Sequence, residues 1–217
     1  MKLRFLALTA LLGLSSLSIA LAQIKLPKTG LAGTTHDIGA NGCKSCHAPH
    51  NGSSAFGGTQ NTGLILLWSR SFPAAANTFG IYDSNTMNNK AIEFGGSALN
   101  NSTDVRMYSL LCLSCHDGVT STFSPAMTTA NKVGSKASFG GGAPESLGLT
   151  NDHPVNVPHD PTKDAGLRPV ATVAASLPLY GSTNTVQCGT CHDPHGNTNT
   201  NYLRQPNNTA HCTTCHL

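Results

Sequence analysis

All eight cysteines of this 217-residue chain stand in pairs separated by two residues, and a histidine directly follows every pair. The cysteines are Cys43, Cys46, Cys112, Cys115, Cys188, Cys191, Cys212 and Cys215, and the histidines are His47, His116, His192 and His216. This C-x-x-C-H spacing is the attachment signature of a c-type haem. Two thiols add to the two vinyl groups of the haem, and the next histidine then lies beneath the iron as proximal ligand. The sequence therefore predicts four covalently bound haem c groups.

Two other uses of eight cysteines fit the pattern less well. A disulfide framework is common in secreted chains, and two structural zinc ions would also use paired cysteines. Neither use requires a histidine at one fixed position after each pair, and histidine supplies only 10 of the 217 residues. Because covalent haem does require that histidine, we expect no cysteine to remain for a disulfide.

Two of the motifs are followed by a second histidine that cannot easily ligate the haem attached at the same motif. His195 lies three residues after His192, and His50 lies three residues after His47. Residues three apart lie on the same side of a helical turn, whereas a distal ligand must approach the iron from the opposite face of the ring. We therefore expect His50 and His195 each to ligate a neighbouring haem and so to hold two haems close together.

Four other histidines are further candidates for distal ligands. His36 precedes the first motif by seven residues, and His153 lies between the second and third motifs. His159 competes with His153, and His211 directly precedes Cys212, which limits its reach to a distal face. The alternative for each is an ordinary surface histidine. The expected distal set is His36, His50, His153 and His195, with His159 and His211 as secondary candidates.

Two histidines on every iron would leave no open coordination position. Such an iron does not bind oxygen, nitrite or peroxide, and its potential is low because methionine is the ligand that raises it. We therefore expect an electron carrier that works by outer-sphere transfer and has no enzymatic activity. A multihaem reductase is the alternative, and it would need one iron with an open position.

The first residues have the pattern of a secretory signal peptide. Lys2 and Arg4 precede an apolar run that ends in Ala20-Leu21-Ala22, which resembles an A-x-A cleavage site. A membrane anchor is the other interpretation of this run. We expect residues 1–22 to be the signal peptide, residues 23–217 to form a single tetrahaem domain, and no later segment to cross a membrane.

Composition limits both the fold and the partners. Hydrophobic residues make up 39% of the chain, and stretches such as 85–89 and 197–201 are rich in asparagine, so the side chains alone form a poor core. We expect a haem-cored fold of mostly irregular chain with few strands and with short helices at the attachment sites, including one over 105–113. The net charge is +3 without a basic run, which does not favour binding to nucleic acid.

Several motifs, in this order, resemble the extracellular multihaem cytochromes of the OmcE and OmcS type. They are CKSCHAPHN at 43–51, LWSR at 67–70, LCLSCHDG at 111–118, HPV at 153–155 and CGTCHDPHG at 188–196. The resemblance spans most of the chain after residue 22. The number of motifs and the length are most similar to the tetrahaem cytochromes of OmcE type.

The resemblance implies a secreted cytochrome that polymerises. Subunits of this family stack so that their haems form a continuous chain along a filament, and one haem near the subunit boundary takes its distal histidine from the neighbouring subunit. The position that matches this donor is His50. The implied partners are copies of the same chain, other redox cytochromes and extracellular acceptors, and the implied location is outside the cell or at its surface. The alternative is a soluble periplasmic four-haem electron shuttle with all its ligands in one chain.

Overall fold

The structure is a computed structural model, and it describes residues 31–48, 50, 66–70, 81–92, 104–116, 149–150 and 152–217. All eight cysteines and all ten histidines lie within these residues. The expected signal peptide at 1–22 lies outside them, as does the start of the expected domain at residue 23.

Short helices and turns separated by irregular chain make up the described residues. In chain order the helices and strands are η2 (Ile38–Ala40), η3 (Gly42–Ser45), α1 (Met107–His116), β1 (Val157–Pro158), α2 (Val170–Ala174), β2 (Thr185–Val186), α3 (Cys188–Cys191), η7 (Thr200–Tyr202) and α4 (Thr209–Thr213). Strands β1 and β2 pair antiparallel, with Val157 opposite Val186. Within the described ranges, no helix has the length and apolar character needed to span a bilayer.

The helix expected over 105–113 is confirmed, with its bounds moved toward the C-terminus. Helix α1 spans Met107–His116, so the second C-x-x-C-H motif forms its last part. Met107, Leu110 and Leu113 lie three residues apart on one face and are at most 2% exposed. Together with Leu149 they form a small buried apolar cluster, against which Trp68 packs.

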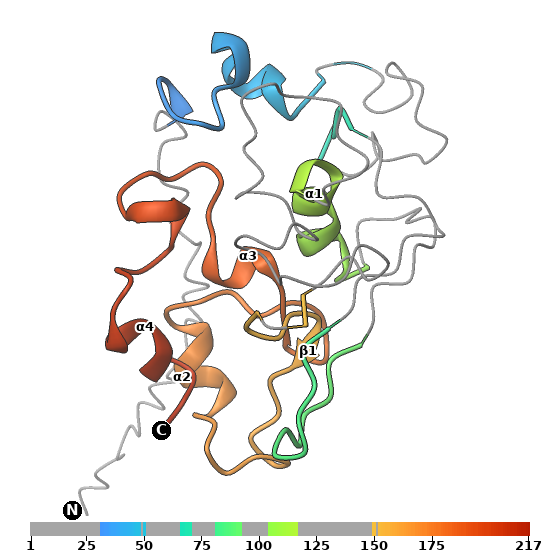
Figure 1. The fold of residues 1–217 in the computed structure, drawn as a ribbon, viewed down its shortest axis with the longest axis vertical. Helices are drawn as coiled ribbons and strands as arrows, with labels where there is room; N and C mark the ends of the chain where they lie inside the picture. The colour runs from blue at the N-terminus through green and yellow to red at the C-terminus, as the bar shows by residue number, and fades with distance from the viewer. Residues whose placement is uncertain are drawn as a thin grey trace, which may run out of the picture.

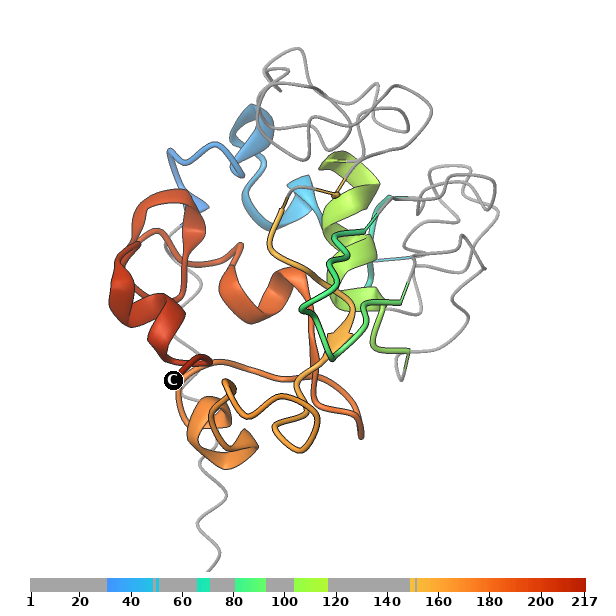
Figure 2. The same ribbon diagram turned by 60° about the horizontal axis from the view of Figure 1, so that its bottom comes forward.

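Helix α1 packs directly against α3, which carries the third motif. The two helices lie side by side in Figures 1 and 2. Tyr108 of α1 stacks on Tyr180 with ring centroids 3.8 Å apart. Gly189 permits this close approach, because a Cβ atom at that position would lie 2.7 Å from Tyr180 Oη. The attachment sites of the second and third motifs are thereby held together.

A buried hydrogen-bond network reinforces the contact between α1 and α3. Ser109 Oγ donates to Gln187 Oε1 (2.6 Å) and accepts from the main-chain nitrogen of Cys188 (2.9 Å). Gln187 Nε2 donates to Asn156 Oδ1 (2.9 Å). Ser109, Gln187 and Asn156 are at most 2% exposed. Each of these bonds satisfies a polar group whose burial would otherwise cost about 1–3 kcal/mol.

The four motifs follow one another along the long axis of the molecule. In Figure 1 the turn η3, in which the first motif begins, lies at the top beside η2. Helices α1 and α3 lie in the middle, and α4 lies below them near the C-terminus. The spatial order of the four motifs is thus the same as their order in the sequence.

Candidate haem-binding sites

Six histidines form three ring pairs, and each pair joins a histidine of a C-x-x-C-H motif to one outside such a motif. The pairs are His47 with His195, His116 with His36, and His216 with His153. The ring centroids are 6.2 Å apart in every pair. An imidazole nitrogen binds a metal at about 2 Å, which puts two opposed ring centres about 6 Å apart. The spacing of each pair therefore fits one metal ion between two axial imidazoles.

The pairs differ in the angle between their rings. The rings of His47 and His195 are nearly parallel, with an interplanar angle of 15°. The angle is 75° between His36 and His116, and it is 71° between His153 and His216. The three sites therefore present two distinct axial arrangements to a bound iron.

Main-chain carbonyls hold two of the proximal rings by Nδ1. His47 Nδ1 donates to the carbonyl oxygen of Leu66 (2.6 Å), and His192 Nδ1 donates to that of Asn201 (2.8 Å). A ring that donates from Nδ1 presents Nε2 as its ligating nitrogen. Burial lowers the pKa of His192, which favours the neutral ring that a metal requires.

Two of the distal candidates are also held in place. His153 Nδ1 donates to the carbonyl oxygen of Pro154 (3.0 Å). The His36 ring stacks on Tyr202 at a centroid distance of 4.1 Å, and the His36 main-chain nitrogen donates to Tyr202 Oη (3.2 Å). Burial lowers the pKa of His36, which favours the neutral ring that a metal requires.

Asp193, inside the CHDPH motif, orients the distal candidate that follows it. Its Oδ1 accepts a hydrogen bond from the main-chain nitrogen of His195 (3.0 Å) and lies 3.4 Å from His195 Nδ1. Its Oδ2 accepts from Arg204 Nη1 (3.3 Å). The matching residue of the first motif is Ala48, which has no carboxylate. His195 thus has support from its own chain that the sequence does not provide for His50.

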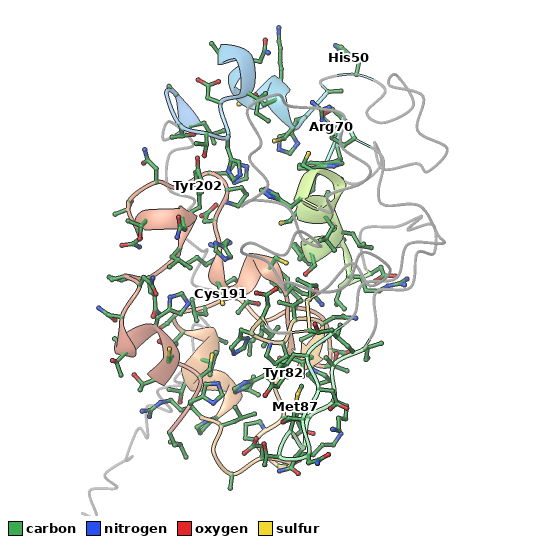
Figure 3. All side chains as sticks on the ribbon, viewed as in Figure 1. His50, Arg70, Tyr82, Met87, Cys191 and Tyr202 are labelled. Atoms are coloured by element: carbon green, nitrogen blue, oxygen red, sulfur yellow. The ribbon has the colours of Figure 1, made fainter. Side chains whose placement is uncertain are left out.

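His192 differs from the other three proximal histidines, because no second histidine ring is paired with it within the described ranges. After burial and the bond to Asn201, the nearby His211 is the next influence on the His192 pKa, which it lowers. His50 is exposed and has no ring partner among the described residues. Figure 3 shows His50 at the upper edge of the molecule, far from Cys191 in the middle.

His159 is in a different environment from the paired histidines. Its side chain is buried, with the residue 3% exposed, and its Nε2 donates to the carbonyl oxygen of Arg168 (2.8 Å). Its main-chain nitrogen donates to the carbonyl oxygen of Asn184 (3.1 Å). These contacts connect the chain before α2 with the turn before β2.

Cysteines of neighbouring motifs lie close together in the structure. The first and second motifs adjoin: burial raises the pKa of Cys46 to about 11, and Cys115 is the next contributor. Trp68 Nε1 also donates to Ser114 Oγ (3.0 Å), and the Trp68 ring packs edge-on against His47. The first and second motifs therefore contact each other through their cysteines and also through Trp68, which bonds to Ser114 and packs on His47.

The second, third and fourth motifs adjoin in the same way. A hydrogen bond between the Cys112 and Cys188 thiols raises the pKa of the first and lowers that of the second. Burial raises the pKa of Cys191 to about 11, with Cys215 of the fourth motif as the next cause. The attachment sites are therefore neighbours in the order one, two, three, four. Among the described residues, no cluster of three or more His, Cys, Asp or Glu side chains could hold a metal without haem.

Comparison with known proteins identifies one family match. A family model described as a doubled CXXCH motif matches residues 182–217, which contain the third and fourth motifs. No curated protein matches the chain. The match supports a haem c-binding electron-transfer protein of the c-type cytochrome kind. The first and second motifs lie outside the matched residues.

Proposed function

We propose that the chain is a four-haem c-type cytochrome that carries electrons outside the cell as a filament of identical subunits. The proposal rests on one mismatch in the pairing of histidine rings within the described residues. His192 has no paired ring, and His50 is an exposed histidine without one. Every subunit would then have one spare histidine, His50, and one iron, beside His192, that lacks a second histidine. A head-to-tail assembly needs such a complementary pair on every subunit.

Bound haem c would supply the one-electron chemistry. The residues of the chain would attach it through the paired thiols and would bind its iron through imidazole nitrogens. The ring pairs at 6.2 Å support this role for His36, His153 and His195 in three sites. The adjoining motifs would arrange the four groups in one row, which favours transfer from one end of the subunit to the other.

We assign the fourth distal position, opposite His192, to His50 of a neighbouring subunit. His50 projects at the end of the molecule that carries the first motif, where it can reach outward. Ala48 leaves it without the carboxylate that orients His195. An outward histidine without support from its own chain is suited to a ligand whose position is fixed by the partner.

The second candidate function is a soluble four-haem shuttle, and the position of His211 favours it. His211 is near enough to His192 to lower its pKa through charge repulsion. A modest shift of α4, where His211 lies, would complete all four sites within one chain. His50 would then be an ordinary surface histidine.

Matched alanine variants of His50 and His211 separate these two functions. The filament predicts that His50→Ala abolishes polymers, seen by electron microscopy, and gives one high-spin haem per chain, seen by magnetic circular dichroism. His211→Ala should change neither. If His211→Ala produces the high-spin haem and His50→Ala does not, the shuttle is correct.

Two simpler measurements test the rest of the proposal. The mass of the mature protein should exceed that of residues 23–217 by four haem groups. The reduced wild-type protein should not bind carbon monoxide, because all irons have two axial ligands. Carbon monoxide binding at one haem would instead indicate a reductase with an open iron.

A further inference from the structure

The segment 201–204 contacts the third motif in a regular pattern. The contacts are a hydrogen bond from the nitrogen of Asp193 to Tyr202 O (2.7 Å), an antiparallel bridge between His192 and Leu203, and a hydrogen bond from the nitrogen of Arg204 to Cys191 O (2.8 Å). The segment thus binds the main chain on both sides of the proximal histidine.

The same three contacts recur at the first motif with the segment 66–70. They are a hydrogen bond from the nitrogen of Ala48 to Leu67 O (2.8 Å), an antiparallel bridge between His47 and Trp68, and a hydrogen bond from the nitrogen of Ser69 to Cys46 O (2.8 Å). The register is identical, although this segment follows its motif by nearly twenty residues and the other by about ten.

They recur again at the fourth motif, where the segment 165–168 precedes the motif in the chain. The contacts are a hydrogen bond from the nitrogen of Leu217 to Gly166 O (2.8 Å), an antiparallel bridge between Leu167 and His216, and a hydrogen bond from the nitrogen of Arg168 to Cys215 O (2.8 Å). The same contacts therefore form whether the segment precedes its motif in the sequence or follows it. The residues that follow the second motif lie outside the described part of the chain.

Each segment also carries an arginine that binds the attachment turn. Arg204 Nε donates to the carbonyl oxygen of Gly189 (2.8 Å), and Arg168 Nε donates to that of Thr213 (2.5 Å). Gly189 and Thr213 each directly follow the first cysteine of their motif. Arg70 lies one position later in its segment than these two arginines, and its Nη2 donates to the carbonyl oxygen of Ser45, the second residue after Cys43 (3.3 Å). All three segments therefore place an arginine on the attachment turn, with the arginine of the first segment shifted by one residue.

We propose that the segments 66–70, 165–168 and 201–204 are three copies of one haem brace, whose arginine and main chain fix the orientation of the proximal imidazole. The inference rests on haem binding at these motifs, but it does not depend on polymerisation. In two copies the brace also accepts the Nδ1 hydrogen of the proximal ring, at Leu66 and Asn201. Such a bond fixes the ring plane and raises the basicity of the ligand.

Backbone strain accompanies the brace at these two sites. Leu66 and Leu67 have φ of 56° and 55°, and Asn201 and Tyr202 have φ of 56° and 58°. Non-glycine residues rarely adopt the left-handed region and persist there where the surroundings hold them. Two consecutive strained residues at the carbonyl that accepts the Nδ1 hydrogen are consistent with a positioning role.

Electron paramagnetic resonance of the oxidised protein tests the brace, because the angle between the axial imidazoles sets the anisotropy of a low-spin haem signal. The nearly parallel pair of the first site should give a rhombic signal, and the perpendicular pairs should give strongly anisotropic ones. The variants are Arg70→Gln for the first site and Arg168→Gln for the fourth. Arg70→Lys and Arg168→Lys retain the positive charge, which glutamine lacks, and are the conservative variants.

We expect Arg70→Gln to shift the g-values of the rhombic signal alone and Arg168→Gln to shift one anisotropic signal alone. The lysine variants should restore most of the wild-type signal. Lys163→Gln, which removes an exposed charge near the fourth-site brace, should shift nothing. Unchanged g-values in both glutamine variants, or equal shifts of all signals, would overturn the brace. Absence of low-spin signals from the wild type would instead contradict haem ligation itself.

Discussion

At the scale of single residues, the histidines divide according to what surrounds their rings. Helical spacing predicted that His195 could not serve the haem attached beside His192, and the structure pairs His195 with His47 instead. The premise was wrong, because α3 ends at Cys191 and His192 is extended, so His192 and His195 do not share a helical turn. The ligand roles themselves stay predictions. Spacing could not have identified Tyr202, whose stacking on His36 joins residues more than 160 positions apart. Such a contact has no local signature in the sequence.

The environment of His159 gives a prediction at this scale. His159→Ala should leave every haem low-spin, because Nε2 is already bound to the carbonyl oxygen of Arg168. It should lower the free energy of unfolding by about 1–3 kcal/mol, because the buried ring and its hydrogen bond to that partly buried carbonyl are lost. Absorption spectra and denaturant unfolding measure both effects.

His153→Ala is the matched comparison, since it should open the iron opposite His216 and produce a high-spin haem. A high-spin haem in the His159 variant and none in the His153 variant would reverse the assignment of these two residues.

At the scale of elements, the sequence predicted that the attachment motifs would lie in short helices. The second, third and fourth motifs overlap α1, α3 and α4, as expected for short helices at attachment sites, whereas the first motif begins in the 3-10 turn η3. The packing of α1 against α3 was not predictable, because it depends on the Tyr108–Tyr180 stack and on the buried bonds of Ser109. These side chains come from segments about 70 residues apart and follow no periodic pattern.

Gly189 tests the contact between these helices. Gly189→Ala would place a Cβ atom 2.7 Å from Tyr180 Oη, so α3 must move away from α1 or the tyrosine stack must open. We expect a loss of about 1–3 kcal/mol in the free energy of unfolding, as for other overpacked sites.

Gly196→Ala is the control for this substitution, because its nearest neighbour atom, in Asp193, would be 3.8 Å away. Chemical denaturation of the two variants should show a loss for Gly189→Ala only. Equal stability of both variants would mean that α1 and α3 are not packed this closely.

At the scale of the whole molecule, the described part of the chain has little apolar interior of its own. One buried cluster consists of Met107, Leu110, Leu113 and Leu149, and the α1–α3 contact depends on buried polar groups. The low hydrophobic content already predicted that another component must fill the core. The order of the motifs in space was not predictable, because the intervening segments are long and carry no strong pattern.

The chain should therefore depend on haem to fold. We expect a variant with all eight cysteines changed to alanine to lack a cooperative thermal transition, because haem attachment and folding are coupled as metal binding and folding are in small metal domains. Circular dichroism and limited proteolysis of the purified chain provide the measurement. A haem-free chain with a sharp unfolding transition would show that its side chains suffice for a core.

In the proposed filament, each subunit receives its last axial ligand from the next subunit. Cryo-electron microscopy of the native protein recovered from outside the cells would identify that ligand. We expect filaments in which the iron beside His192 is bound by His50 of the neighbouring subunit. Discrete particles in which His211 occupies that position would contradict it.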